Sequence, residues 1–347
     1  MKGLMICHRV RLPYRVMRCM SEAGVEVYVL GNEISKGLRH SHFCRELIQS
    51  QFDFDGSYSP EMADEINRYV RELGIDVVFP GDAPSSRSFH GVKHLIQANC
   101  YPGPTLEQFD LLNNKWEFAA LCEELEILSP RSRLYESRSE LEAAIRTGDV
   151  SLPSIAKPVS MDGSQGVVKL SEGKWEKQLA GVEYAPILVQ PFIEGEDIGA
   201  SVYCKGGEIE TIIVHKLDKG VYETFHQAGI HETIYKISSK FKLDGVYNFD
   251  MRATANGDIY YLECNPRFFF KMYLSMVAGI NFAVPGLQID AQVPAALSKA
   301  TATRTPRAWP SLLVKPWSVK RKDLELARFL FRDSVNFMRE VTKIDND

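Results

Sequence analysis

Two acidic side chains in the C-terminal half of the chain are the residues best placed to do chemistry. Asp250 and Glu263 lie in two alternating segments joined by Asn256-Gly257, a dipeptide typical of a two-residue type I′ hairpin turn. Such a turn places Asp250 directly across from Glu263, with Cβ atoms about 5 Å apart. Two carboxylates at that distance repel by roughly 3 kcal/mol at an effective dielectric constant near 20. Either one of them is protonated or a cation lies between them.

The chemistry that this pair favours is the binding of a hard divalent cation. Mg²⁺ prefers oxygen ligands and is often held by one or two carboxylates, with phosphate oxygens completing its shell. Because side chains alternate along a strand, Arg252, Asn265 and Arg267 fall on the same face as the two acids. The competing interpretation is a solvated hairpin face whose salt bridges contribute little.

The bulk properties exclude several classes of protein. The chain has 347 residues, which predicts two or three domains. Its net charge of −4 gives no electrostatic case for nucleic acid. The seven cysteines are scattered without zinc-binding spacing, which indicates reduced thiols. Since no apolar run approaches the roughly 18 residues of a membrane span, we expect a cytoplasmic protein without a membrane partner.

The N-terminal part predicts an α/β arrangement. Short apolar strands alternate with helices that have short connections, which is typical of a parallel sheet. The first strand–helix turn lacks a Gly-x-Gly-x-x-Gly motif, so a dinucleotide cofactor is not expected there. The expected strands cover 4–7, 25–30 and 76–80, and the expected helices cover 14–23 and 60–73.

Two further helices are predicted later in the chain. Ser139 reads as the N-cap of a helix over 139–147. An apolar stripe over 323–343 predicts a C-terminal helix that packs on its own protein or on a second subunit, so a homodimer is left open.

A small-residue loop and an apolar linker could contact a nucleotide. Ser160–Gly166 follows a strand that carries Lys157, and backbone N–H groups of such a loop can approach phosphate oxygens. The apolar strand 188–193 could offer backbone groups to adenine, and Asp197 could accept from ribose hydroxyls. Each feature alone is weak, because a plain hairpin loop and a solvated acidic turn would look the same.

Taken in order, these features resemble the ATP-grasp superfamily over roughly residues 1–290. Tyr101–Phe118 is similar to the start of the nucleotide domain in biotin carboxylase and carbamoyl phosphate synthetase. Glu263-Cys-Asn-Pro-Arg267 is similar to their Glu-x-Asn-x-Arg signature. The lid, however, carries fewer glycines than the biotin carboxylase type, so biotin carboxylation is not expected.

The resemblance implies a role for each matching residue. Lys115 and Lys157 would bind ATP phosphates, and a mobile lid would close over them; its residues are Ser160, Gly163, Ser164, Gln165 and Gly166. Adenine and ribose would contact Gln190 (where the family usually has Glu), Phe192, Ile193 and Asp197, with Glu196 as the substitute for Asp197. One or two Mg²⁺ ions, or Mn²⁺, would bind Asp250, Glu263 and Asn265, and the catalytic groups would be Arg267, Asn265 and Lys157.

The fold class that follows is α/β: an ATP-grasp fold preceded by a Rossmann-like, parallel-sheet (pre-ATP-grasp) domain. We expect that first domain over 1–104, a lid subdomain over 105–186, and a C-terminal subdomain with the magnesium site over 187–300. A linker and helix would occupy 301–347.

The implied function is an ATP-dependent carboxylate–amine ligase that forms an amide or peptide-like bond through an acyl phosphate. His215, Lys216, Arg252 and Lys271 would contact the small-molecule substrates, the alternative being ordinary surface residues.

Two other functions remain open: a carbamoyl-phosphate-synthetase-like kinase or carboxylase of a small acid, and a non-catalytic ATP-binding regulatory protein. Intact Asp250, Glu263, Asn265 and Arg267 argue against the latter, because nucleotide binding alone does not require all four. Neither substrate can be named from sequence, since acceptor pockets are built from loops without a portable motif.

Overall fold

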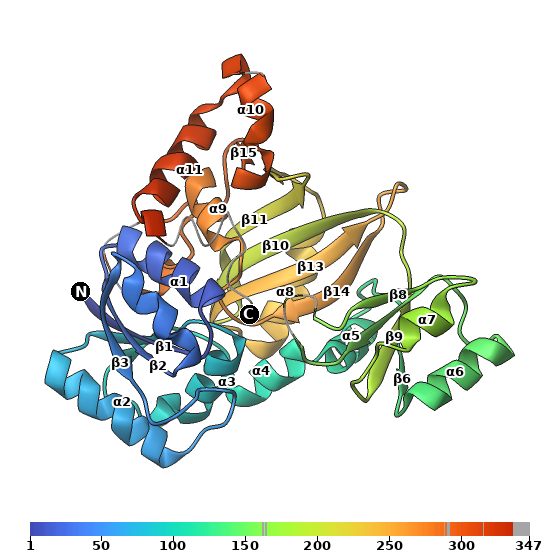
Figure 1. The fold of residues 1–347 in the computed structure, drawn as a ribbon, viewed down its shortest axis with the longest axis horizontal. Helices are drawn as coiled ribbons and strands as arrows, with labels where there is room; N and C mark the ends of the chain where they lie inside the picture. The colour runs from blue at the N-terminus through green and yellow to red at the C-terminus, as the bar shows by residue number, and fades with distance from the viewer. Residues whose placement is uncertain (162, 164, 288, 290–291, 315, 336–347) are drawn as a thin grey trace. The chain divides into compact units, whose positions relative to one another are not determined.

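The computed structural model describes residues 1–161, 163, 165–287, 289, 292–314 and 316–335. By its internal contacts the chain separates into two compact units (Figure 1). Unit 1 comprises Met1–Phe109, Ala200–Asn248 and Pro266–Asp347, and unit 2 comprises Asp110–Gly199 and Phe249–Asn265. The predicted division at residues 104, 186 and 300 is finer than this and stays a prediction. Within the described residues, no helix is both long and apolar enough to cross a membrane.

Unit 1 contains the parallel sheet that the sequence predicts. Its order is β3-β2-β1-β4-β5, and every neighbouring pair is parallel. Leu4 and Ile6 of β1 pack with the two helices α2 and α3, whereas Met5 and Cys7 pack with α1, as the alternation of side chains along a strand requires. The bounds are β1 Lys2–Cys7, α1 Arg11–Glu22, β2 Glu26–Gly31, β3 Cys44–Gln49, α2 Pro60–Leu73, β4 Val77–Pro80, α3 Ala83–Val92 and β5 Asn99–Cys100.

Two helices of this unit differ from the sequence-based expectation. Helix α1 begins at Arg11 rather than Tyr14, and includes Pro13; proline is tolerated in a first turn, where its missing N–H would have no helical partner. Helix α3 was not expected, because its sequence carries no apolar stripe. Its N-cap is Asp82, whose carboxylate accepts the N–H of Ser85 at 2.9 Å in a capping box.

A second sheet has the strand order β14-β13-β10-β11-β12-β15. Strands β10 and β13 each begin in one unit and end in the other. Helix α11 belongs to unit 1 and packs into its core through Leu326, Phe329 and Leu330. The helix ends at Phe331, and the end predicted at residue 343 lies outside the described residues. The bounds are β10 Glu196–Lys205, β11 Glu208–Asp218, β12 Val221–Phe225, α8 Ile230–Phe241, β13 Gly245–Ala253, β14 Ile259–Asn265, α9 Met272–Ala278, β15 Ala302–Arg304 and α11 Arg321–Phe331.

Unit 2 holds a four-stranded antiparallel sheet of order β6-β9-β7-β8. Leu141 of helix α6 and Leu179 of helix α7 pack with Ala156 and Leu170 of the sheet to form the core. The bounds are α4 Leu106–Asn113, α5 Lys115–Glu124, β6 Arg133–Tyr135, α6 Arg138–Thr147, β7 Ser154–Pro158, β8 Val168–Leu170, α7 Trp175–Leu179 and β9 Ile187–Pro191.

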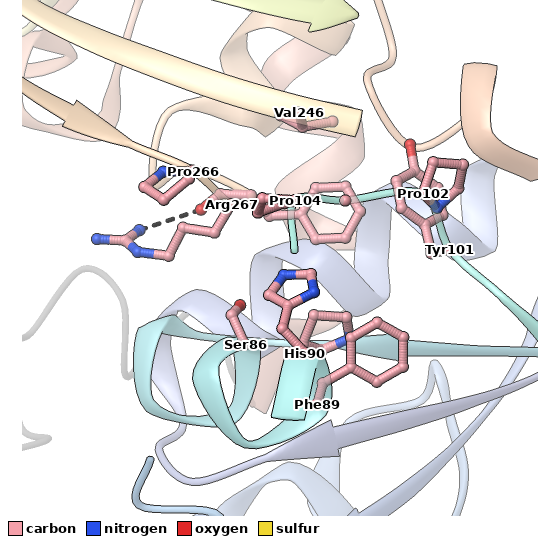
Figure 2. A pocket seen from close by; sticks show the side chains of 12 residues that line it. Ser86, Phe89, His90, Tyr101, Pro102, Pro104, Val246, Pro266 and Arg267 are labelled. Carbon is pink, nitrogen blue, oxygen red and sulfur yellow. Dashed lines mark hydrogen bonds between the residues drawn. The ribbon is translucent and has the colours of Figure 1, made fainter. Parts of the chain in front are cut away.

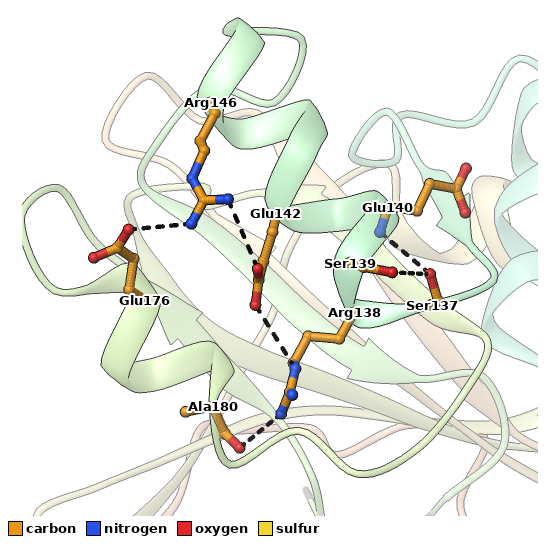
Figure 3. Close-up of polar contacts among 8 residues, drawn as sticks. All are labelled: Ser137, Arg138, Ser139, Glu140, Glu142, Arg146, Glu176 and Ala180. Atoms are coloured by element: carbon orange, nitrogen blue, oxygen red, sulfur yellow. Dashed lines mark hydrogen bonds and ion pairs between the residues drawn. The ribbon is translucent and has the colours of Figure 1, made fainter.

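The N-cap of helix α6 lies two residues before the predicted one. Ser137, not Ser139, accepts the N–H of Glu140 at 3.2 Å, and Ser139 contacts only the Ser137 hydroxyl among the residues drawn in Figure 3. Arg138 and Arg146 both lie within ion-pair distance of Glu142, and Arg146 also reaches Glu176 of α7 at 3.4 Å. These exposed pairs contribute little energy each, so the cap is the stronger determinant of where α6 begins.

We expect Ser137→Ala to loosen the first turn of α6, because the Glu140 N–H loses its acceptor. A lost cap costs about 1 kcal/mol, which corresponds to roughly fivefold faster amide hydrogen exchange in that turn. The matched control is Ser139→Ala, which removes a neighbouring hydroxyl that caps nothing. Equal exchange rates in the two variants would contradict this assignment of the cap.

Candidate active site

The hairpin β13–β14 carries the two acids, but its turn is not the predicted one. The Thr254 N–H donates to Asp258 O at 2.9 Å, and the Gly257 N–H donates to Thr254 O at 3.0 Å. The loop therefore contains three residues rather than two, with Gly257 in a left-handed conformation at φ +93°. The type I′ prediction is wrong because Asn256-Gly257 also suits the longer turn in which only the glycine needs positive φ.

Asp250 and Glu263 nevertheless lie side by side. Their carboxyl groups are within hydrogen-bonding reach of each other, and the Asn265 Nδ2 donates to Asp250 Oδ2 at 3.1 Å. The three side chains that were expected to bind a metal are thus gathered at one place in unit 2. The side chain of Glu263 is 28% exposed, so the group is partly open to solvent.

Two buried lysines balance these acids. Lys115, the first residue of α5, lies 3.2 Å from Glu263 Oε2 through its Nζ and donates to Met161 O at 2.6 Å. Asn114 caps this helix and so fixes where Lys115 begins it. Lys157 of β7 is buried and directs its Nζ to Leu262 O at 3.4 Å.

Burial and charge act against each other on the pKa values of this group. Burial lowers the pKa of Lys157 to about 8, and Lys115 adds to the lowering while Glu263 and Asp250 oppose it. Burial would raise the pKa of Glu263, but Lys115 and Lys157 outweigh it and the pKa is lowered. At neutral pH the group therefore holds a charged Lys157 beside a charged Glu263.

The donor set fits magnesium. Two carboxylates and one amide supply only oxygen ligands, which suits a hard cation that keeps part of its shell for phosphate and water. In the described part of the chain there is no cluster of three or more His, Cys, Asp or Glu side chains suited to metal. The group is thus too small to enclose a metal by itself and would share the ion with a bound phosphate.

A second group of predicted residues surrounds the linker between β9 and β10. The ring of Phe192 lies between two cations, with Lys169 Nζ at 3.3 Å and Arg252 Cζ at 4.7 Å from its centroid. Arg252 also donates to Asp197 Oδ1 at 3.0 Å and to Gly195 O at 3.1 Å. The linker passes so close to β13 that a Cβ on Gly195 would lie 2.1 Å from Ala253 O.

The remaining linker and lid residues are placed as follows. Gln190 is buried and donates to Ser132 Oγ at 2.8 Å, which orients its amide. Ile193 follows Phe192, and Glu196 begins β10.

The lid residues Ser160, Gly163, Gln165 and Gly166 are exposed between β7 and β8, and Tyr184 donates to Gly166 O at 2.6 Å. Ser164 lies outside the described residues.

The other predicted substrate residues, His215, Lys216 and Lys271, lie in unit 1, where burial and then the charge of Lys271 lower the pKa of His215. His215 is fully buried between Tyr222 and Phe269, and its Nε2 is 3.2 Å from Ser201 Oγ. Lys216 pairs with Glu223 on the neighbouring strand at 3.8 Å, and Lys271 precedes α9. The burial of His215 gives it a packing role that the sequence did not indicate, and its contact with substrate stays a prediction.

Arg267 lines a pocket within unit 1 and donates to Phe268 O at 3.1 Å (Figure 2). Ser86 and His90 also line this pocket. Both come from helix α3; Ser86 lies in the segment 85–87 that the sequence predicts to form one wall of the substrate pocket, whereas His90 carries no local motif that would identify it.

The fold is shared with enzymes of known structure. An L-amino acid ligase from Bacillus licheniformis superimposes with a TM-score of 0.62 at 18% identity, covering 83% of this chain and 73% of that one. A carboxyaminoimidazole ribonucleotide synthase from Aspergillus clavatus, solved with ATP, gives a TM-score of 0.66 at 13% identity, covering 91% and 86%. Both likenesses show the fold of ATP-grasp enzymes.

Sequence comparison agrees with the fold. Residues 183–307 match a family model described as "ATP-grasp in the biosynthetic pathway with Ter operon". The large chain of carbamoyl phosphate synthase from Thermoanaerobacter sp. (strain X514) is 22% identical in an alignment of 288 residues that covers 73% of this chain. The match spans 24% of that relative's length. The predicted resemblance to the ATP-grasp superfamily is confirmed, and the chain has the ATP-grasp fold.

The pKa of Lys157 predicts how nucleotide affinity depends on pH. Below pH 8 the side chain carries its charge, and as pH rises through about 8 it loses that charge, so phosphate binding weakens. If only the protonated form binds, affinity for ADP falls roughly tenfold between pH 7 and pH 9. Calorimetric titration with ADP, without divalent metal, measures this fall.

The control for this titration is Lys157→Arg, whose guanidinium stays charged over the whole range. Its affinity should change little with pH, whatever its absolute value. A wild-type affinity that is level from pH 7 to pH 9 would show that Lys157 does not contact the phosphates.

Proposed function

We propose that this protein is an ATP-dependent carboxylate–amine ligase that works through an acyl phosphate. The observation that carries the proposal is the group Lys115, Lys157, Asp250, Glu263 and Asn265 within unit 2, in which two lysines face two acids and an amide. Positive side chains beside an oxygen-only metal site suit a triphosphate and its metal ion. The ligase fold neighbours support the same reaction class.

Each residue has a role in this proposal. Lys115 and Lys157 bind the phosphates under the lid Ser160, Gly163, Ser164, Gln165 and Gly166, and Asp250, Glu263 and Asn265 hold magnesium. When bound, the metal ion supplies positive charge to the phosphate oxygens. Gln190, Phe192 and Ile193 contact adenine, and Asp197 accepts from the ribose with Arg252 holding its carboxylate in place. Arg267 neutralises the developing negative charge.

The chemistry has two displacement steps. An oxygen of the substrate carboxylate bonds to the γ-phosphorus while the bond from that phosphorus to the β,γ-bridging oxygen breaks, which gives ADP and an acyl phosphate. The amine nitrogen then attacks the acyl carbon, phosphate leaves with the electrons of the carbon–oxygen bond, and the nitrogen loses a proton. The protein needs no covalent nucleophile, because positioning and charge neutralisation supply the catalysis.

A second candidate function, phosphorylation or carboxylation of a small acid, is supported by a sequence match. The match to the large chain of carbamoyl phosphate synthase supports a kinase or carboxylase of a small acid that stops before amide formation. Phosphate release with ATP, Mg²⁺ and pooled carboxylic acids, with and without pooled amines, separates the possibilities. Release that requires the amine supports the ligase, release without amine supports the kinase, and no release with any mixture supports a binding protein.

We expect Glu263→Gln to abolish turnover without unfolding the protein. The substitution removes one metal ligand and the partner of Lys115, so kcat should fall at least a thousandfold, about 4 kcal/mol in barrier. Phosphate release measures the loss, and circular dichroism checks the fold. Glu172→Gln, at an exposed site in the same unit, is the matched control and should keep full activity. Retained activity in Glu263→Gln would overturn the proposed function.

A further inference from the structure

Gln190 of β9 lies on the same face of the four-stranded sheet of unit 2 as Lys157. Lys157 of β7 is directly opposite Leu188, and Gln190 follows Leu188 by two residues, so the three side chains share one face. The opposite face, which carries Ala156 and Val189, is enclosed in the core of the unit. Since the proposed function places the phosphates at Lys157, a nucleotide that follows this face meets Gln190 with its base.

The side-chain amide of Gln190 has a fixed orientation. The residue is 3% exposed, and its Nε2 donates to Ser132 Oγ at 2.8 Å. The Ser132 hydroxyl donates in turn to Pro130 O at 3.1 Å. A carbonyl oxygen only accepts, so the single hydrogen of the hydroxyl is used there, and the hydroxyl oxygen has to accept from Gln190. The NH₂ end of the amide is therefore toward Ser132, and Oε1 is the end left for a ligand.

The backbone holds Ser132 in place beside this amide. Arg133, the first residue of β6, is paired with Val189, so the preceding residue, Ser132, comes next to Gln190 on the neighbouring strand. Within the described residues, no other side chain hydrogen-bonds to the Gln190 amide. The orientation of the amide thus depends on one hydroxyl.

The orientation of an amide decides which purine it accepts. A turn of 180° exchanges the C=O acceptor for the NH₂ donor, whereas the two oxygens of a carboxylate are equivalent acceptors. Adenine presents an amino donor at position 6, and 6-oxo purines present an acceptor there. An amide held with Oε1 toward the base hydrogen-bonds to adenine. Against a 6-oxo purine it leaves two acceptors facing each other away from water, which is costly.

We propose that Ser132 is a positioning residue that sets the base selectivity of this protein. It holds the Gln190 amide so that Oε1 accepts from the 6-amino group of adenine and rejects 6-oxo purines. The inference rests on the proposed function, which places adenine at Gln190, and adds how the base is selected. Ser132 acts through Gln190 and does not itself contact the nucleotide.

Three purine nucleoside diphosphates that differ at position 6 test the selectivity: ADP, inosine diphosphate and purine riboside diphosphate, which has only hydrogen there. Calorimetric titration with Mg²⁺ gives a Kd for each without any turnover. We expect purine riboside diphosphate to bind roughly three- to tenfold more weakly than ADP, the size of one neutral hydrogen bond. Inosine diphosphate should bind at least about thirtyfold more weakly than ADP, because its oxygen opposes Oε1.

Variants of Ser132 show whether its hydroxyl causes this preference. In Ser132→Ala the amide is free to turn, so the preference for ADP over inosine diphosphate should fall to about threefold or less. Ser132→Thr keeps the hydroxyl and should keep the wild-type ratio. A merely structural effect would weaken all three nucleotides alike and leave the ratio unchanged. Ser139→Ala, at an exposed serine of the same unit, is the matched control and should behave as wild type.

A double variant tests the reason for the effect. Ser132→Ala combined with Gln190→Glu should recover the preference for ADP, because a carboxylate presents an acceptor in either orientation. If Ser132→Ala does not fold by circular dichroism, Ser132→Val replaces it, since valine has the shape of the threonine variant without the hydroxyl. Failure of the double variant to recover the preference would overturn the role given to the amide orientation.

The outcomes separate this inference from the proposed function. If carboxylate and amine drive phosphate release but Ser132→Ala keeps the wild-type ratio, or wild type shows no preference, the role of Ser132 is wrong and the ligase stands. If the ratio behaves as expected but no substrate mixture releases phosphate, the ligase fails and the base selection stands. If wild type binds none of the three nucleotides, both are wrong.

Discussion

The balance of charge between two buried lysines and two acids is the interaction on which the rest of unit 2 depends. Removing any of these charges from water costs several kcal/mol, so each is tolerated only with its partners in place. Lys115 lies 3.2 Å from Glu263, and Lys157 reaches the backbone beside it. The contacts of Lys115 and Lys157 therefore hold together the start of α5, the strand β7 and the hairpin β13–β14. A nucleotide and its metal would enter a group that is already close to neutral.

The linker between β9 and β10 is held by a second electrostatic arrangement. Lys169 and Arg252 lie on Phe192 through cation–π contacts, which are worth most where water is excluded. Arg252 is two residues from Asp250 on the same strand, so side-chain alternation places both on one face. By bonding Asp197 and Gly195, Arg252 connects the segment expected to bind the nucleoside with the strand expected to bind the metal.

Much of the α/β part could be predicted from sequence because its signals are local. Helix α2 has the predicted bounds 60–73, and the strands β1, β2 and β4 lie where short apolar runs indicated them. The failures also have local causes. The helix predicted from Tyr14 begins at Arg11 because a first turn tolerates Pro13, Ser137 caps the helix for which the sequence predicts Ser139, and Asn256-Gly257 is compatible with two turn lengths. Helix α3 has no apolar periodicity, so it was not predicted, although Asp82 caps it and Pro84 lies in its first turn.

The sequence by itself determined the class of fold and which side chains belong to the acid–amide group, because order and spacing along the chain carry that information. It could not determine that Phe192 lies between two cations, that His215 is enclosed in the core, or that His90 and Arg267 line one pocket. Those arrangements join residues distant in the chain. They depend on how side chains fill space once the elements have packed, and packing is decided by the whole set of contacts rather than by any local pattern.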